Sequence, residues 1–309
     1  MEYHRLHSIV KWRVSPHLRR SRPSSGWPGP ATLSGRFPKT ALAAVPAVRQ
    51  TTRIAVKYLL DNTLAPLTFS WGFLEASVDA VSHRYARWQR TILHRVRVTA
   101  IDLPLADALQ QLEPLDMGSQ RVLFLSTKTR WTACFDNGAT GGNPSTIVGE
   151  LSRQLRCQGV ACGCIPNTLT RSAAATQGTW GAVKFTLFGP EQRDFLNVER
   201  AVSVINDVRG WEFKAIGRPQ PFERPERYAA RRIADRFTSE MLEEYCGALG
   251  IQLFDENFYG GAGVITHAHP WFLPRLATMT LAEARARLGL NEPTRREGRS
   301  SQPLDDEET

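Results

Sequence analysis

The sequence lacks the features that would send the chain to a membrane or to the secretory pathway. No stretch approaches the roughly 20 uninterrupted apolar residues of a transmembrane helix, and the one early apolar run, SIVKW, is too short for the core of a signal peptide. Cysteine is scarce and odd in number, with five in 309 residues, which disfavours a disulfide framework. We therefore expect a cytoplasmic protein with reduced thiols and no membrane span.

The sequence also lacks the short motifs that mark common catalytic and cofactor sites. The patterns G-x-S-x-G, H-E-x-x-H and C-x-x-C are absent, as are the glycine-rich signatures of P-loop and dinucleotide-binding proteins. These absences leave no cofactor to predict, and they favour a protein without enzymatic activity.

The composition, 42% hydrophobic and 22% charged, is that of a globular protein, but its charge is unevenly placed. Residues 1–53 hold ten of the 39 basic residues, one of the 30 acidic residues and six of the 19 prolines. The formal net charge of +9 therefore belongs to this segment, and the rest of the chain is neutral. We expect a disordered basic arm: an organellar presequence, a segment that contacts nucleic acid or lipid, or an extension from an upstream start codon. A neutral body makes nucleic acid an unlikely partner for the folded part.

The hydrophobic pattern predicts a single α+β domain over residues 70–290, followed by a disordered polar tail over 291–309. We expect a mostly antiparallel sheet of about five to seven strands with helices packed on one face. A helix is expected over residues 70–90, from apolar residues at helical spacing between Leu74 and Trp88, and another over ERYAARRIADRF. Asp102 is expected to cap a short helix, and the glycine-rich segment LFDENFYGGAGVITHAHPWF is expected to be an ordered loop. RVLFLST and WTACFDNG are expected to pair as a hairpin, and two later helices are expected to begin after Thr238-Ser239 and at a capping box of Thr280 and Glu283.

Two histidines, His267 and His269, form the first candidate site. The pair lies near Asp255, Glu256 and Tyr259 in sequence. An extended segment would project both imidazoles to one side, where the nearby carboxylates could complete a metal shell. A metal-dependent hydrolase is therefore one alternative function, against a hydrogen-bonded loop.

A basic stretch over residues 83–97 forms the second candidate. Arg84, Arg87, Arg90 and Arg95 lie there without an acidic residue and with two aromatic residues among them, a pattern that can bind nucleic acid. The aromatic residues also belong to the apolar stripe of the predicted helix. In the competing interpretation, the rings therefore pack on the core and the arginines form the solvent-exposed face of the helix.

Two further patterns receive a structural interpretation. The loop FDNGATGGNPS joins a strand to a helix start and could cradle a phosphate, but a tight turn is the simpler explanation. Cys157, Cys162 and Cys164 lack the spacing of a zinc knuckle and are expected to be buried structural thiols.

Three tryptophans at predicted turns, Trp131, Trp180 and Trp211, could anchor a protein interface. Together with the absence of catalytic motifs, they favour a non-enzymatic protein-binding module of immunity or adaptor type. The sequence does not indicate the oligomeric state.

The stretch FLSTKTRWTACFDNG, with PQPFERPERYAARRIADRFTSEMLEEYCGALGIQLFDENFYG, resembles a family of uncharacterised bacterial proteins without an assigned activity. The resemblance covers roughly residues 91–265. It implies a bacterial, cytoplasmic α+β domain and carries no catalytic residue to this chain.

Overall fold

A computed structural model describes residues 57–92, 94–118, 120–171, 176–193, 196–270 and 277–290. All of them belong to one compact unit, Thr52–Thr309. The predicted arm over 1–53 and the predicted tail over 291–309 lie outside the described residues. Within the described ranges, no helix is both long enough and apolar enough to cross a membrane.

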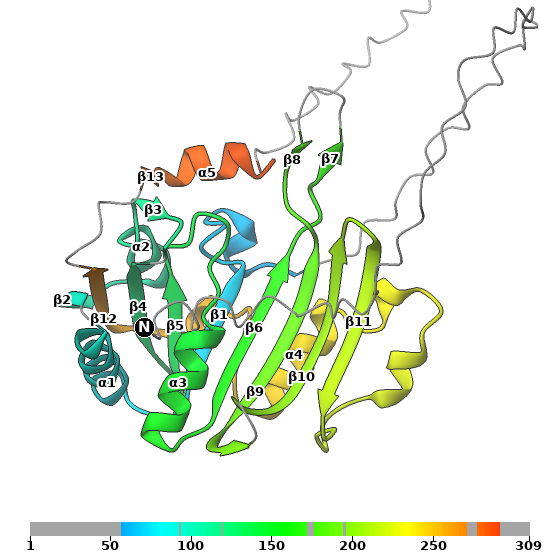
Figure 1. The fold of residues 1–309 in the computed structure, drawn as a ribbon, viewed down its shortest axis with the longest axis horizontal. Coiled ribbons are helices and arrows are strands. Elements are labelled where there is room, and N and C mark those ends of the chain that lie inside the picture. The colour runs from blue at the N-terminus through cyan, green and yellow to red at the C-terminus, as the bar shows by residue number, and fades with distance from the viewer. Residues whose placement is uncertain are drawn as a thin grey trace, which may run out of the picture. The chain divides into compact units, whose positions relative to one another are not determined.

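The central feature is a nine-stranded sheet in which every neighbouring pair of strands is antiparallel (Figure 1). The α+β prediction with an antiparallel sheet is confirmed, but the sheet is larger than five to seven strands. In spatial order its strands are β11 (Gly210–Gly217), β10 (Leu196–Asp207), β9 (Ala182–Arg193), β6 (Gly159–Ile165), β1 (Ser70–Leu74), β5 (Thr132–Asp136), β4 (Arg121–Thr127), β12 (Tyr259–Pro270) and β2 (His94–Asp102).

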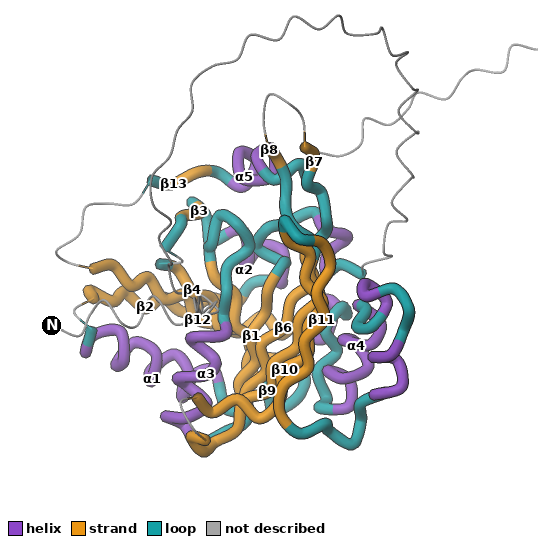
Figure 2. Tube along the Cα trace, turned by 45° about the vertical axis from the view of Figure 1, so that its right-hand side comes forward, coloured by secondary structure: helices purple, strands orange, loops and turns teal. Residues whose placement is uncertain are grey.

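Helices cover both faces of this sheet, so the expectation of helices on one face was wrong. On one face, α1 (Val78–Thr91) and α3 (Ser145–Leu155) pack with Phe124 and Phe188 in one apolar cluster. On the other face, α2 (Leu105–Gln110) and α4 (Ser239–Ala248) pack with Trp71 and Phe185 in a larger cluster. Figure 2 shows α1 and α3 together on one side of the strands and α4 on the other. The strands at the centre of the sheet read as continuous apolar runs because both of their faces are buried.

Short elements complete the described chain. A last helix, α5 (Leu281–Arg287), follows the small ladder of β13 (Thr278–Met279) with β3 (Leu115–Asp116), and β7 (Thr170–Arg171) pairs with β8 (Thr176–Gln177). The remaining turns are 3₁₀ segments: η1 (Leu59–Asn62), η2 (Pro225–Ala229), η3 (Ile233–Asp235) and η4 (Glu256–Phe258).

Several local predictions are confirmed where the signal was local in sequence. Strands β4 and β5 pair as the predicted hairpin. The Thr238 side chain accepts a hydrogen bond from the Met241 backbone N–H and begins α4. Thr280 and Glu283 form the predicted capping box of α5.

The helix predicted over 70–90 begins later than expected. Residues Ser70–Leu74 form the buried strand β1, and α1 begins only after Ser77, whose side chain accepts a hydrogen bond from the Ala80 backbone N–H. A short apolar strand that is buried on both faces has no alternation of polar and apolar residues to mark it as a strand. Leu74 therefore matched the helical spacing of α1 by chance.

One further helix prediction was wrong, and the short helix expected after Asp102 forms as α2 but without its predicted cap. The segment ERYAARRIADRF forms the short 3₁₀ segments η2 and η3 instead of a helix. Asp102 ends strand β2, and α2 begins after Pro104 without a side-chain cap. In ERYAARRIADRF, long-range packing therefore outweighs a local helix signal.

The glycine-rich segment expected as a loop contains the strand β12. The β12–β4 ladder shifts register between Tyr259 and Gly263, and a Cβ on Gly260 would lie 2.3 Å from the Ser126 side-chain oxygen. The glycines therefore permit a bulge and a close approach of two strands, so they do not signal a loop.

Candidate functional site

Strand β2 lies at one edge of the large sheet, with β12 as its one strand neighbour among the described residues (Figure 1). Residues that face each other across an antiparallel ladder point to the same face. Arg95 lies opposite His269, and Arg97 lies opposite His267. His267 in turn lies opposite Arg121 of β4. We call these five residues, Arg95, Arg97, Arg121, His267 and His269, the basic face.

The arginines of the basic face have no acidic partner in the described chain. Arg95 and Arg97 are exposed, and Arg121 is half-buried. None of the three makes an ion pair or a side-chain hydrogen bond within the described ranges. Arg97 and Arg121 lie on the two strands that flank His267, so positive charge is concentrated on this face and an anionic ligand would neutralise it.

The two histidines do lie together, as the metal prediction requires. Their ring centroids are 6.4 Å apart, and burial, followed by the nearby Arg121, lowers the pKa of His267. The arginines on either side oppose the binding of a cation. Among the described residues, no group of three or more His, Cys, Asp or Glu side chains could hold a metal ion.

The carboxylates considered as partners of the histidines lie at the other end of β12. Asp255 and Glu256 precede Tyr259, the first residue of the strand, whereas His267 lies eight residues along it. Tyr259 lies opposite Thr127 of β4 and His267 opposite Arg121, six residues away, so at about 3.3 Å per residue the separation is roughly 20 Å. The two carboxylates are therefore close to the histidines in sequence but far from them in space.

The arginines of the predicted nucleic-acid site lie on two faces of the sheet. Arg84, Arg87 and Arg90 belong to α1, which packs on the Phe124 face, whereas Arg95 points to the opposite face. Tyr85 is 3% exposed, and its ring meets the Phe124 ring at a centroid distance of 5.3 Å. The packed ring is the structural alternative expected from the sequence, and it leaves Tyr85 unavailable to stack on a base.

The three candidate interface tryptophans differ in exposure. Trp131 is 2% exposed and lies in the larger apolar cluster, where its indole N–H donates to the Leu249 carbonyl at 2.9 Å. A ring buried to this extent offers no surface to a partner, so the interface expectation fails for Trp131. Trp180 and Trp211 are half-buried, and Trp211 packs against the same cluster.

The glycine loop after β5 already holds an anion of its own. The Asp136 carboxylate accepts hydrogen bonds from the backbone N–H of Gly138 at 2.9 Å and of Asn143 at 3.1 Å. A Cβ on Gly142 would lie 2.1 Å from the same carboxylate. The donors that could have cradled a phosphate are therefore bonded to Asp136, in agreement with the structural interpretation of this loop.

The cysteines are free thiols, as expected. Cys134, Cys162, Cys164 and Cys246 are buried, and Cys157 is half-buried. Burial, together with a hydrogen bond to Cys246, raises the pKa of Cys162 well above its ordinary value. Buried thiols with raised pKa values are poor nucleophiles and poor metal ligands.

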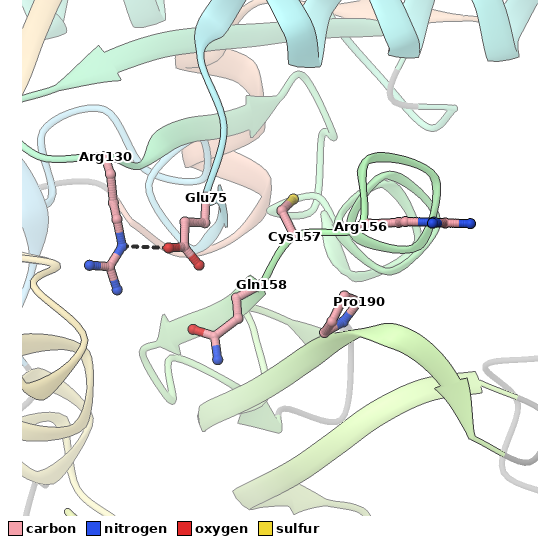
Figure 3. Close-up of a pocket in the computed structure, with 6 residues that line it drawn as sticks. All are labelled: Glu75, Arg130, Arg156, Cys157, Gln158 and Pro190. Atoms are coloured by element: carbon pink, nitrogen blue, oxygen red, sulfur yellow. Dashed lines mark ion pairs between the residues drawn. The ribbon is translucent and has the colours of Figure 1, made fainter.

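An open pocket of about 520 Å³ lies beside Cys157, where β1, α3, β6 and β9 come near one another (Figure 3). Its lining includes Glu75, whose carboxylate pairs with the Arg130 guanidinium at 2.7 Å. Burial, followed by the charge of Glu75, raises the pKa of Cys157 to about 11. The pocket therefore presents a protonated thiol at neutral pH and no base bonded to it among the described residues.

Cys157 is expected to react slowly with alkylating reagents at pH 8. A thiol pKa of about 11 in place of 9.0 leaves about a hundredfold less thiolate at that pH. The rate of iodoacetamide labelling should rise about tenfold per pH unit up to pH 10, with Cys157→Ser as the unlabelled control. A labelling rate that levels off below pH 9 would contradict this environment.

Sequence reasoning missed Arg121 as a member of the basic face. Arg121 begins an apolar strand and gave no signal of its own, because its neighbour β12 was expected to be a loop. The one usable signal was the run of three β-branched residues from Val264 to Thr266, which favours a strand. No family model, curated protein or solved structure matches this chain.

Proposed function

We propose that this protein is a non-enzymatic binding module, of immunity or adaptor type, that receives an acidic protein at the edge of its large sheet. The observation that carries the proposal is the basic face: three arginines without an acidic partner in the described chain, together with two histidines, beside an exposed edge strand.

Charge and exposure support an acidic protein as the partner. Unpaired arginines are enriched in protein interfaces because their planar guanidinium groups bind carboxylates in a bidentate way. Arg84, Arg87 and Arg90 on α1 add positive charge near the same edge, since α1 packs against both β2 and β12. The surrounding positive potential would speed the encounter with an acidic partner.

A pair of matched baits tests the proposal. Purified wild-type chain, Arg95→Glu/Arg97→Glu, and the control Arg227→Glu/Arg231→Glu are each immobilised and exposed to the same cell extract. Arg227 and Arg231 are also exposed, but they lie outside the basic face. We expect an acidic protein that wild type and control retain equally and that the first variant retains at least tenfold less. Binding of the captured and purified protein is then measured directly.

The nucleic-acid alternative gives a different result in the same assay. If the wild-type chain binds generic duplex DNA with an affinity that falls steeply with salt, and captures no acidic protein, the phosphate-binding hypothesis replaces the proposal. Equal capture by all three baits would also contradict it.

A further inference from the structure

The outer edge of β2 is long and regular. Nine successive residue pairs join it to β12, from Ala262 opposite Asp102 to Pro270 opposite His94, without a register shift. Alternate backbone N–H and C=O groups of an edge strand point away from its neighbour. No described strand pairs with this side of β2, and β2 contains no proline or bulge to block pairing.

The two faces of β2 differ in chemistry. Arg95 and Arg97 point to the basic face, whereas Val96, Val98 and Ala100 point to the face covered by α1. Val98 is 46% exposed, so the apolar row is not fully covered by the described chain. A strand added at this edge would therefore meet a basic row on one face and an apolar row on the other.

The spacing of these rows determines what an added strand would carry. Side chains directly opposite each other in an antiparallel ladder have Cβ atoms about 4.5–5.5 Å apart and share a face. Two residues spaced i and i+2 would lie opposite Arg95 and Arg97, while the residue between them would lie on the apolar face. Carboxylates at i and i+2 would pair with both guanidinium groups, and His267 and Arg121 lie one and two strands behind these arginines.

A second copy of this chain does not meet these requirements. Antiparallel pairing of β2 with itself would bring two more arginines to the basic face, and like charges across a ladder are destabilising. Charge complementarity therefore favours a different, acidic strand.

We propose that β2 binds its partner by strand addition, and that the added segment alternates acidic and apolar residues so that Asp or Glu at i and i+2 faces Arg95 and Arg97. This inference rests on the proposed function and names the recognition element of the same surface. Backbone hydrogen bonds would supply affinity, and the acidic row would set register and specificity.

Two fluorescent peptides of identical composition test the inference on the full chain. One alternates glutamate and valine over eight residues, and the other groups the same residues in pairs. We expect the alternating peptide to bind at least tenfold more tightly by fluorescence anisotropy and to slow amide hydrogen exchange within residues 94–102. Arg95→Glu/Arg97→Glu should lose this binding and should instead bind the alternating lysine–valine peptide, while Arg227→Glu/Arg231→Glu behaves as wild type.

The outcomes separate this inference from the proposed function. Equal affinity for the two peptides, or binding without protection of residues 94–102, overturns strand addition but leaves an acidic partner on the basic face. Failure of the bait experiment, with no protein whose capture depends on Arg95 and Arg97, overturns the proposed function itself. Failure of the lysine–valine peptide to bind the charge-reversed variant overturns the assignment of the acidic row to these two arginines.

Discussion

Replacing Glu223 with alanine is expected to lower the free energy of unfolding by about 3–5 kcal/mol, because it would leave a buried guanidinium without its counter-ion. The side chains of Arg200 and Glu223 are 3% and 0% exposed. Two hydrogen bonds of 2.8 and 2.7 Å join the guanidinium to the carboxylate. The hydroxyl of Tyr228 donates a third to the same carboxylate at 2.7 Å.

The loss would extend beyond the ion pair. The Glu223 carboxylate also accepts the Gln220 backbone N–H at 2.9 Å, and Tyr228 in turn shares a hydrogen bond of 2.8 Å with Tyr245 of α4. Glu223 therefore fixes the segment after β11 to the sheet and to α4. Burial alone would lower the pKa of Arg200, but the hydrogen bonds and charge of Glu223, together with Tyr228, outweigh it and raise that pKa. The guanidinium of the variant would stay charged even without Glu223, because arginine does not lose its proton in folded proteins.

Urea denaturation of matched variants measures the effect. Glu150→Ala, which breaks the exposed Glu150–Arg153 pair, should cost less than about 1 kcal/mol and serves as the control. The double variant Arg200→Met/Glu223→Gln, which removes both charges, should recover part of the loss. An effect of Glu223→Ala no larger than that of Glu150→Ala would show that the buried pair is not coupled to folding.

The sequence was sufficient where a signal and its partner lie close together in the chain. The hairpin of β4 and β5 needs four connecting residues, and the caps at Thr238 and Thr280 act within three residues. These features depend on local geometry, which a pattern of residue types records directly.

The features that the sequence did not predict depend on contacts between residues far apart in the chain. Strand β1 is a strand because Ser70 lies opposite Gly163 and Gly72 opposite Cys134, and neither neighbour leaves a trace near residue 70. The basic face unites residues around 96, 121 and 268 through two ladders. The sequence therefore provided His267, His269 and Arg95 separately, whereas their juxtaposition with Arg97 and Arg121 required the fold.

The Trp131→Ala variant is expected to lose about 3–5 kcal/mol of stability, because it opens a cavity in the larger apolar cluster and removes a hydrogen bond. The indole is 2% exposed and donates to the Leu249 carbonyl, at the end of α4. Thr129 of the same turn donates to the Gly250 carbonyl at 3.2 Å. The turn between β4 and β5 is thus attached to α4, and Trp131 is the larger of the two attachments.

The same variant distinguishes a core role from an interface role for this tryptophan. Trp131→Phe keeps most of the ring but not the indole N–H, so it should cost less than Trp131→Ala. Trp211→Ala, at a half-buried ring beside the same cluster, should also cost less. If Trp131 were an interface anchor, Trp131→Ala would keep the wild-type unfolding midpoint and lose the captured partner. A core residue gives the opposite result: the unfolding midpoint falls, and the folded Trp131→Ala chain keeps its affinity for the partner. Affinity is kept because Arg95 and Arg97 lie on β2, which β12 separates from the β4–β5 hairpin.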